Sequence, residues 1–177
     1  VVINTAIFNE KDFIRRAVFN FGSQCIVAAA DVRLVGNDYY VFSNSGQSRM
    51  LLLCEWIDKV NDYDVGEVFL NSIDRDGMKC GYDIDLIKFV KNKIKKPIIA
   101  AGGAGNPLHV KQLLTQVSSA AAIGNILYHS EHPTSVVKAY LKNNNQNVRS
   151  SCSINYEQFE FNKKGWVIPI NHDSIYF

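Results

Sequence analysis

Short apolar segments alternate with amphipathic segments along most of this chain, and that alternation limits the folds that it can adopt. The apolar segments are rich in Ala, Ile and Val, and we expect buried β-strands at residues 1–4, 25–30, 67–70, 97–101 and 120–123. Apolar side chains recur at helical spacing after them, which predicts helices at residues 10–21, 50–60, 83–93, 107–116 and 133–143. Strand–helix units that repeat at roughly 30 residues build parallel sheets. The sequence therefore predicts an α/β fold.

The strands also indicate how such a sheet is closed. Short strands of small and branched apolar residues suit a βα barrel, where every strand is covered on both faces. An open, doubly wound sheet is the alternative, and it usually carries its glycine-rich phosphate loop after the first strand. Here the run Gly102-Gly103-Ala104-Gly105 follows the fourth predicted strand. We therefore favour the barrel.

Two segments fall outside the repeat. Residues 33–42 read as a β-hairpin that turns at Gly36-Asn37. The polar run 143–147 resembles a linker, so we divide the chain into residues 1–149, which form the barrel part, and a tail at residues 150–177. The tail reads as a possible hairpin around Lys163-Lys164-Gly165, and its pattern indicates no role.

Composition excludes several classes of protein. A net charge of +2 and an isoelectric point near 8.3 give no strong basic field, so we expect no nucleic-acid partner. The sequence contains no run of 18 apolar residues, so it predicts no membrane span. The four cysteines lack C-x-x-C spacing, which favours free thiols in a cytoplasmic protein. The first residues, from Val1, read as a strand already under way, so we expect the chain to begin inside a larger protein.

Polar or glycine residues stand at the carboxyl ends of four predicted strands. In a βα barrel these ends point to one rim, where the active sites of the fold are built. The sequence therefore predicts one functional site that gathers Asn4-Thr5, Asp31, the run Asn71-Ser72 through Asp76, and Gly102-Gly103.

Asp31 and the glycine run offer the clearest chemistry at that rim. Asp31 follows six small or apolar residues, and a partly desolvated carboxylate there suits proton transfer. A turn or helix cap is the alternative role for it. Gly102-Gly103 lets backbone N–H groups approach an anion, with the helix after Asn106-Pro107 directing its positive end the same way. A simple tight turn is the alternative there.

The sequence indicates neither a metal ion nor a cofactor. His129 and His132 are three residues apart and could share a helical face, but no carboxylate or cysteine completes a set of ligands. Solvated loop histidines are the better interpretation. The ligand that the rim does suggest is a phosphorylated small molecule.

Four motifs follow one another along the chain: Val2-Ile3-Asn4-Thr5-Ala6, Phe21-Gly22-Ser23-Gln24, Ser72-Ile73-Asp74-Arg75-Asp76-Gly77 and Gly102-Gly103-Ala104-Gly105. Together they resemble the cyclase subunit of imidazole glycerol phosphate synthase, the HisF family. The resemblance runs in order from Val1 to about Arg149 and implies strands four to eight of a (βα)8 barrel. It implies a lyase of histidine biosynthesis, in which a partner glutaminase supplies ammonia that crosses the barrel interior and reacts with a ribulosyl substrate bearing two phosphates.

The resemblance also implies roles for individual residues. Asp31 matches one of two catalytic aspartates, and Asp76 matches a supporting carboxylate at the substrate. Glu67, at the opposite end of its strand, matches a carboxylate near the ammonia entrance. The residues that would bind the substrate and its phosphates are Asn4, Thr5, Asn71, Ser72, Gly102 and Gly103.

Three departures from the family keep other functions open. The second catalytic aspartate belongs to a first strand that these 177 residues do not include. Gly124-Asn125-Ile126 stands where the family usually has an Ala-Ser pair, and Asn71 stands where it usually has Thr. The run at residues 69–73 looks like a branch associated with surface sugars. One alternative is therefore a conduit that passes ammonia to an enzyme that amidinates a sugar, and another is a non-catalytic half-barrel that assembles with a second chain.

Overall fold

The computed structural model describes residues 1–9, 12–43, 48–149 and 154–169 of the chain. The strands are β1 (Val2–Ile3), β2 (Val27–Val35), β3 (Asp38–Ser43), β4 (Ser48–Leu52), β5 (Glu67–Ser72), β6 (Ile98–Ala101) and β7 (Ala120–Ala121). The α-helices are α1 (Ala6–Asn9), α2 (Phe13–Phe21), α3 (Leu53–Asp62), α4 (Ile84–Lys91), α5 (Pro107–Gln116) and α6 (Pro133–Asn143), with 3₁₀ turns η1 (Ser23–Cys25) and η2 (Asn125–Tyr128).

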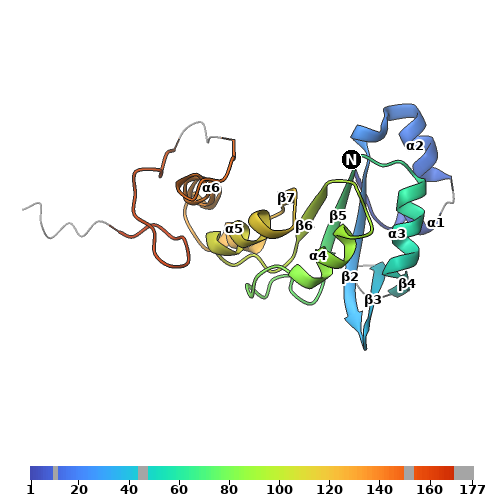
Figure 1. Ribbon diagram of the computed structural model, residues 1–177, viewed down its shortest axis with the longest axis horizontal. Helices are drawn as coiled ribbons and strands as arrows, with labels where there is room; N and C mark the ends of the chain where they lie inside the picture. Colours follow the sequence, from blue (N-terminus) through green and yellow to red (C-terminus); the bar gives the residue numbers. More distant parts are fainter. Residues whose placement is uncertain (10–11, 44–47, 150–153, 170–177) are drawn as a thin grey trace, which may run out of the picture.

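All the strands belong to one sheet, in which β1, β2, β5, β6 and β7 are parallel neighbours in that order. The register sets Ala29 beside Phe69 and Asp31 beside Asn71, so the carboxyl ends of these strands lie along one edge. Beyond β1, strand β2 pairs instead with β3 in antiparallel fashion, and β3 pairs with β4 (Figure 1). The parallel α/β fold predicted from the sequence is confirmed.

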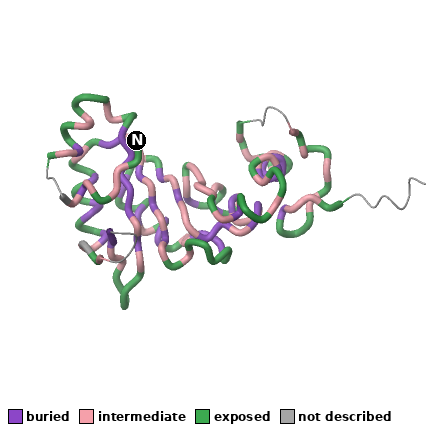
Figure 2. The backbone as a smooth tube through the Cα atoms, turned by 180° about the vertical axis from the view of Figure 1, so that it is seen from behind, coloured by how far each residue is buried: buried purple, intermediate pink, exposed green. Residues whose placement is uncertain are grey.

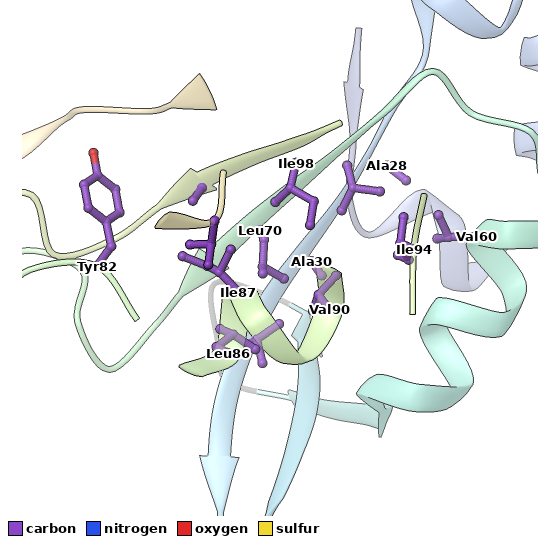
Figure 3. Packing of buried hydrophobic residues seen from close by; sticks show 14 of the residues in the cluster. Ala28, Ala30, Val60, Leu70, Tyr82, Leu86, Ile87, Val90, Ile94 and Ile98 are labelled. Carbon is purple, nitrogen blue, oxygen red and sulfur yellow. The ribbon is translucent and has the colours of Figure 1, made fainter. Parts of the chain in front are cut away.

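One face of the sheet carries the core. Alternate side chains of the strands are buried there, and helix α4 lays Leu86, Ile87 and Val90 against them (Figure 3). Each large apolar side chain that is fully buried contributes about 1.5–3 kcal/mol. Figure 2 shows the buried residues gathered along the strands and the helix surfaces that face them. The strand residues on this face are Ala28, Ala30, Val32, Val68, Leu70, Ile98 and Ala100.

The opposite face of the sheet is less deeply covered. In β5 the side chains of Glu67, Phe69 and Asn71 point to it, and all three are half-buried, whereas Val68 and Leu70 between them are fully buried. Strand alternation explains the difference, because successive side chains point to opposite faces. This second face carries both the apolar Phe69 and the polar residues of the candidate site.

Strand β2 is longer than the sequence predicted. We expected a strand over residues 25–30 with Asp31 at its end, but β2 runs from Val27 to Val35 and Asp31 lies inside it. The predicted hairpin at Gly36-Asn37 is present, and its first strand is the continuation of β2. The partner explains the extension, since β3 supplies backbone hydrogen bonds from Asp31 onward.

Other boundaries also differ from the prediction. Residues 50–52, expected at the start of a helix, belong to β4, because Leu51 and Leu52 pair with β3. The helix that follows begins at Leu53 and buries Leu53, Trp56, Ile57 and Val60, which is the spacing of one helical face. Residues 5–9, expected as a loop, include α1, and β7 ends at Ala121 rather than at residue 123.

Helix α5 agrees with the sequence at both ends. Its predicted range, 107–116, is the observed range. The side-chain Oδ1 of Asn106 accepts a hydrogen bond of 3.0 Å from the backbone N–H of His109, and Pro107 occupies the first turn, where its missing N–H is not needed. These local signals suffice because they do not depend on distant parts of the chain.

The described tail, residues 154–169, packs against helices α5 and α6. The backbone N–H of Leu108 donates to the carbonyl of Lys164 at 3.1 Å. The rings of Tyr140 and Phe161 meet edge to face at 5.6 Å, and Lys142 pairs with Glu157 at 2.6 Å. Phe161 and Val167 form one antiparallel bridge around the turn at residues 162–165.

The helices in the described part of the chain are all too short or too polar to span a membrane.

Candidate functional site

The Asp31 carboxylate is the centre of the candidate site, and two amide side chains hold it. Asn4 donates from Nδ2 to Oδ2 of Asp31 at 2.7 Å, and Asn71 donates from Nδ2 to Oδ1 at 2.9 Å. The two amides come from opposite sides, because β1 and β5 flank β2 in the sheet. Each carboxylate oxygen therefore has its own donor, and the orientation of the Asp31 carboxylate is fixed.

Asn4 reaches Asp31 through the pairing of β1 with β2. Val2 and Ile3 lie beside Val27 and Ala28, which leaves Asn4 just past the end of β1 and level with the site. Its carbonyl accepts from the N–H of Ile7 and starts α1. The side-chain Oδ1 of Asn4 is buried without a hydrogen-bond partner among the described residues. Thr5, next in the chain, is exposed at the same rim.

A small pocket opens beside Asn71 at the carboxyl ends of β5, β6 and β7. Its volume is about 220 Å³. Asp76 stands at this pocket from the loop after β5, with its backbone N–H bonded to the carbonyl of Ser72. The structure thus brings together three of the residues singled out in the sequence, Asn71, Asp76 and Gly102, with Phe69, Ala101, Ala122, Ile123 and Gly124 completing the lining.

Ser72 and Gly103 are placed differently from these residues. The Ser72 side chain is buried on the helix-covered face, where its hydroxyl donates to Oδ2 of Asp83 at 3.3 Å. Asp83 also caps α4 by accepting from the N–H of Leu86. Gly103 packs against the backbone of Gly81, whose N–H donates to the Gly103 carbonyl at 2.8 Å. Neither residue is among those that line the pocket.

Glu67 lies at the opposite end of β5 from the pocket. It pairs with Val27 in the first register of β2 and β5, and its side chain is half-buried. Asn71 lies four positions further along the strand, or about 13 Å away. Phe69 is on the same face between the two, so Glu67 stands at the amino-terminal end of the face that carries the site.

Two rim contacts connect loops that the sequence did not link. Asn125 donates from Nδ2 to the carbonyl of Gly77 at 2.8 Å, and its Oδ1 lies 2.8 Å from Nε2 of His129. The hydroxyl of Tyr82 donates to the carbonyl of Ala122 at 3.0 Å, and burial raises the pKa of Tyr82. Asn125 and Gly77, like Tyr82 and Ala122, are 40 or more residues apart, so no local pattern could have indicated these two bonds.

His109 contacts the glycine loop, and its pKa is lowered in the folded protein. Its Nδ1 accepts from the N–H of Gly105 at 3.3 Å. Burial lowers the pKa of His109, with a smaller contribution from the positive charge of Lys164 in the tail, while a hydrogen bond with the Gly103 backbone opposes the shift. His109 is therefore held in its neutral form more strongly in the folded protein than in the unfolded chain.

We expect His109 to weaken the fold in acid. Because its pKa is lower when folded, the unfolded chain binds the extra proton more readily as the pH falls below about 6.5. The free energy of unfolding of the full-length protein should fall over that range, and it should fall less in His109→Gln. Urea unfolding at pH 8 and pH 5 measures this. An equal loss of stability in both proteins would remove His109 as the cause.

The chain is similar to known proteins along most of its length. The family model described as histidine biosynthesis protein matches residues 1–133. A provisionally named imidazole glycerol phosphate synthase subunit, hisF2 of Vibrio vulnificus, is 37% identical over 167 residues, which are 93% of this chain and 61% of the relative. Imidazole glycerol phosphate synthase subunit HisF of Pelodictyon phaeoclathratiforme is 37% identical over 151 residues, or 84% and 60%. The HisF subunit of a Thermotoga species is 38% identical over 150 residues, which are 84% of this chain and 59% of the relative.

The alignments cover most of this chain but only part of each relative. The chain spans about 60% of the length of these relatives. A 93% share of this chain leaves only about 12 residues outside the alignment with the Vibrio protein, so that alignment reaches into the tail at residues 154–169. The tail therefore has a counterpart in at least one relative.

The comparisons and the sheet agree on the fold family. The family is one of TIM barrels, and the five parallel strands described above form part of such a barrel without closing it. The resemblance inferred from the motifs is confirmed by relatives that match most of this chain. This chain belongs to the histidine biosynthesis protein family and is similar, within it, to the HisF subunits of imidazole glycerol phosphate synthase.

Proposed function

We propose that the complete protein is a cytoplasmic, ammonia-dependent cyclase of the histidine pathway. It would form imidazole glycerol phosphate and aminoimidazole carboxamide ribotide from a ribulosyl phosphate substrate, with ammonia from a partner glutaminase. The observation that supports this best is the Asp31 carboxylate, held by Asn4 and Asn71 at the carboxyl ends of parallel strands. That edge is where barrels of this kind carry their active sites.

Asp31 would transfer protons in this reaction. General acid–base catalysis requires a carboxyl group at hydrogen-bond distance from the reacting atom and in a fixed orientation, and the two amides supply the orientation. Ring closure requires one proton to be removed and another to be delivered, so a second carboxyl group is needed. We expect that partner upstream of Val1, and Asp76 at the pocket would support the substrate.

The substrate phosphates would bind on either side of Asp31. Asn4 and Thr5 lie at the end of β1, where Thr5 is exposed. Gly102 lines the pocket in the loop that leads into α5, whose dipole favours an anion. Gly103 would contribute through the shape of the loop, since the backbone of Gly81 occupies the space beside its Cα atom.

Ammonia would enter at the end of the sheet marked by Glu67. Glu67, Phe69 and Asn71 follow one another along the half-buried face of β5. That face connects the amino-terminal end of the sheet with the pocket, and in a closed barrel it would line the interior. We expect the glutaminase to dock at the Glu67 end, because ammonia released there has this route to Asp31.

Activity of the full-length protein tests this function directly. The protein is given the ribulosyl substrate with free ammonium, which replaces the glutaminase, and the imidazole product is measured. Ready turnover supports the cyclase. No turnover at saturating ammonium, in a folded protein with its first-strand carboxylate present, would reject it.

A second function is favoured by the contacts of Asn125. The family usually offers a serine hydroxyl in this loop, where Ile126 of this chain offers only its backbone. The carboxamide of the neighbouring Asn125 is already bonded to Gly77 and His129. Loss of one hydrogen bond to a charged phosphate weakens binding by about 1.5–3 kcal/mol. The protein would then be an ammonia conduit for amidination of a surface sugar. Tight glutaminase binding without imidazole product would support the conduit, and absence of both would leave assembly with another chain.

A further inference from the structure

Asn71 was expected to contact the substrate, but its hydrogen bond is to Asp31. Its Nδ2 donates to Oδ1 of Asp31 at 2.9 Å, while the other carboxylate oxygen takes its bond from Asn4. The final torsion of an aspartate side chain is soft and roughly two-fold. Two donors on opposite sides remove that freedom, so the direction of the lone pairs that remain for a substrate depends on both amides.

Gly102 on β6's carboxyl-terminal side completes the arrangement around Asn71. A Cβ atom at Gly102 would lie 3.0 Å from Oδ1 of Asn71 and 2.6 Å from the carbonyl oxygen of Ser72. The Asn71 carboxamide therefore lies between Asp31 of strand β2 and Gly102, which directly follows strand β6. A residue with a side chain at Gly102 would push against the oxygen of the same amide that holds Asp31.

We propose that Asn71 is a positioning residue for Asp31. Glycine at position 102 leaves room for the Asn71 carboxamide, while its φ of +88° and the nearby carbonyl of Ser72 require glycine there in any case. Asn71 would act through Asp31 and not through a bond of its own to a phosphate. This inference rests on the proposed function only in so far as Asp31 is the catalytic group. The hydrogen bond itself is independent of which reaction the protein performs.

The proposal gives Asn71 a kinetic signature that phosphate binding would not give. Misplacement of a catalytic group by about 1 Å can lower a rate by about 10²-fold. Loss of an orienting bond therefore lowers kcat, whereas loss of a phosphate contact raises KM. Positioning also implies that Asn71 matters only while the Asp31 carboxylate is present, so the effects of changing both residues should not add.

The first experiment is a double-mutant cycle in the full-length protein with its glutaminase or with free ammonium. Asn71→Leu keeps the branched shape and removes the donor. We expect kcat to fall about 10–100-fold with KM changed by less than about two-fold. Combined with Asp31→Asn, it should lower kcat little further. Asn61→Leu removes an amide of helix α3 that donates to the carbonyl of Lys93; it is the matched control and should leave kcat unchanged. A raised KM, or additive losses in kcat, would overturn the proposal.

The second experiment does not depend on activity. The side-chain amide of Asn71 is followed by ¹H–¹⁵N NMR in the full-length protein with and without Asp31→Ala. Both amide protons should shift when the carboxylate is removed, while the side-chain amide of Asn61 should stay in place. If the wild-type protein shows no cyclase activity but this shift is present, the proposed function fails and the Asn71–Asp31 contact stands. An unchanged Asn71 resonance would overturn the inference whatever the activity.

Discussion

Asp31→Asn in the complete protein is expected to lower kcat by about 10²–10⁴-fold, the range that a positioned acid–base group contributes. The substitution keeps the size of the side chain and removes its capacity to exchange a proton at neutral pH. It also disturbs the local bonding, because Asn4 and Asn71 both donate, and an amide can accept such a bond through only one of its two terminal atoms. Substrate affinity should change little, because the proposed phosphate contacts are made by other residues.

A comparison with a remote carboxylate separates catalysis from folding. Asp38 is exposed at the start of β3, and Asp38→Asn changes the net charge by the same amount without touching the site. We expect that variant to keep its kcat, and both variants to keep cooperative thermal unfolding. Turnover is measured with free ammonium so that glutaminase docking has no influence. If Asp31→Asn retained full kcat, Asp31 would be a structural residue that links three strands.

The parts of the fold that the sequence predicted are those that local signals determine. The predicted bounds of helix α5 were correct at both ends, and Asn106 and Pro107 define its start without help from distant residues. β4 was missed, because whether Leu51 belongs to a strand or to a helix depends on its pairing with β3. The extension of β2 beyond Asp31 has the same cause. Tertiary pairing decided each of these boundaries against local propensity.

The candidate site divides in the same way. Parallel strands explain why Asp31 and Asn71 could be expected at one edge from the sequence, since each residue follows an apolar strand segment and the two strands run in the same direction. That each oxygen of Asp31 has its own amide donor could not be expected, because it depends on the register of β1 and β5 with β2. The role of Asn125 depends likewise on Gly77, which is 48 residues away.

Gly103→Ala should be one of the most destabilising single changes in the protein, although the glycine run first suggested an anion site. Gly103 has a φ of +97°, and a Cβ atom there would lie 2.1 Å from the carbonyl oxygen of Gly81. A backbone conformation that is unfavourable for alanine contributes about 1–3 kcal/mol, and forced overpacking contributes a similar amount. We expect a loss of about 2–6 kcal/mol, which corresponds to a fall in Tm of about 5–20 °C.

Two other glycines separate the contributions to that loss. Gly124→Ala should be the mildest of the three changes, because the φ of Gly124, −128°, is outside the left-handed region and no atom lies within 4 Å of the added Cβ. Gly36 has a φ of +65° with the same open surroundings, so Gly36→Ala should reveal the backbone contribution alone. The fall in Tm of the full-length protein should therefore increase from Gly124 to Gly36 to Gly103. The contrary result is that Gly103→Ala lowers Tm no more than Gly36→Ala and raises KM. That result would mean that the Gly81 backbone can move away from the added Cβ and that Gly103 contributes to binding an anion.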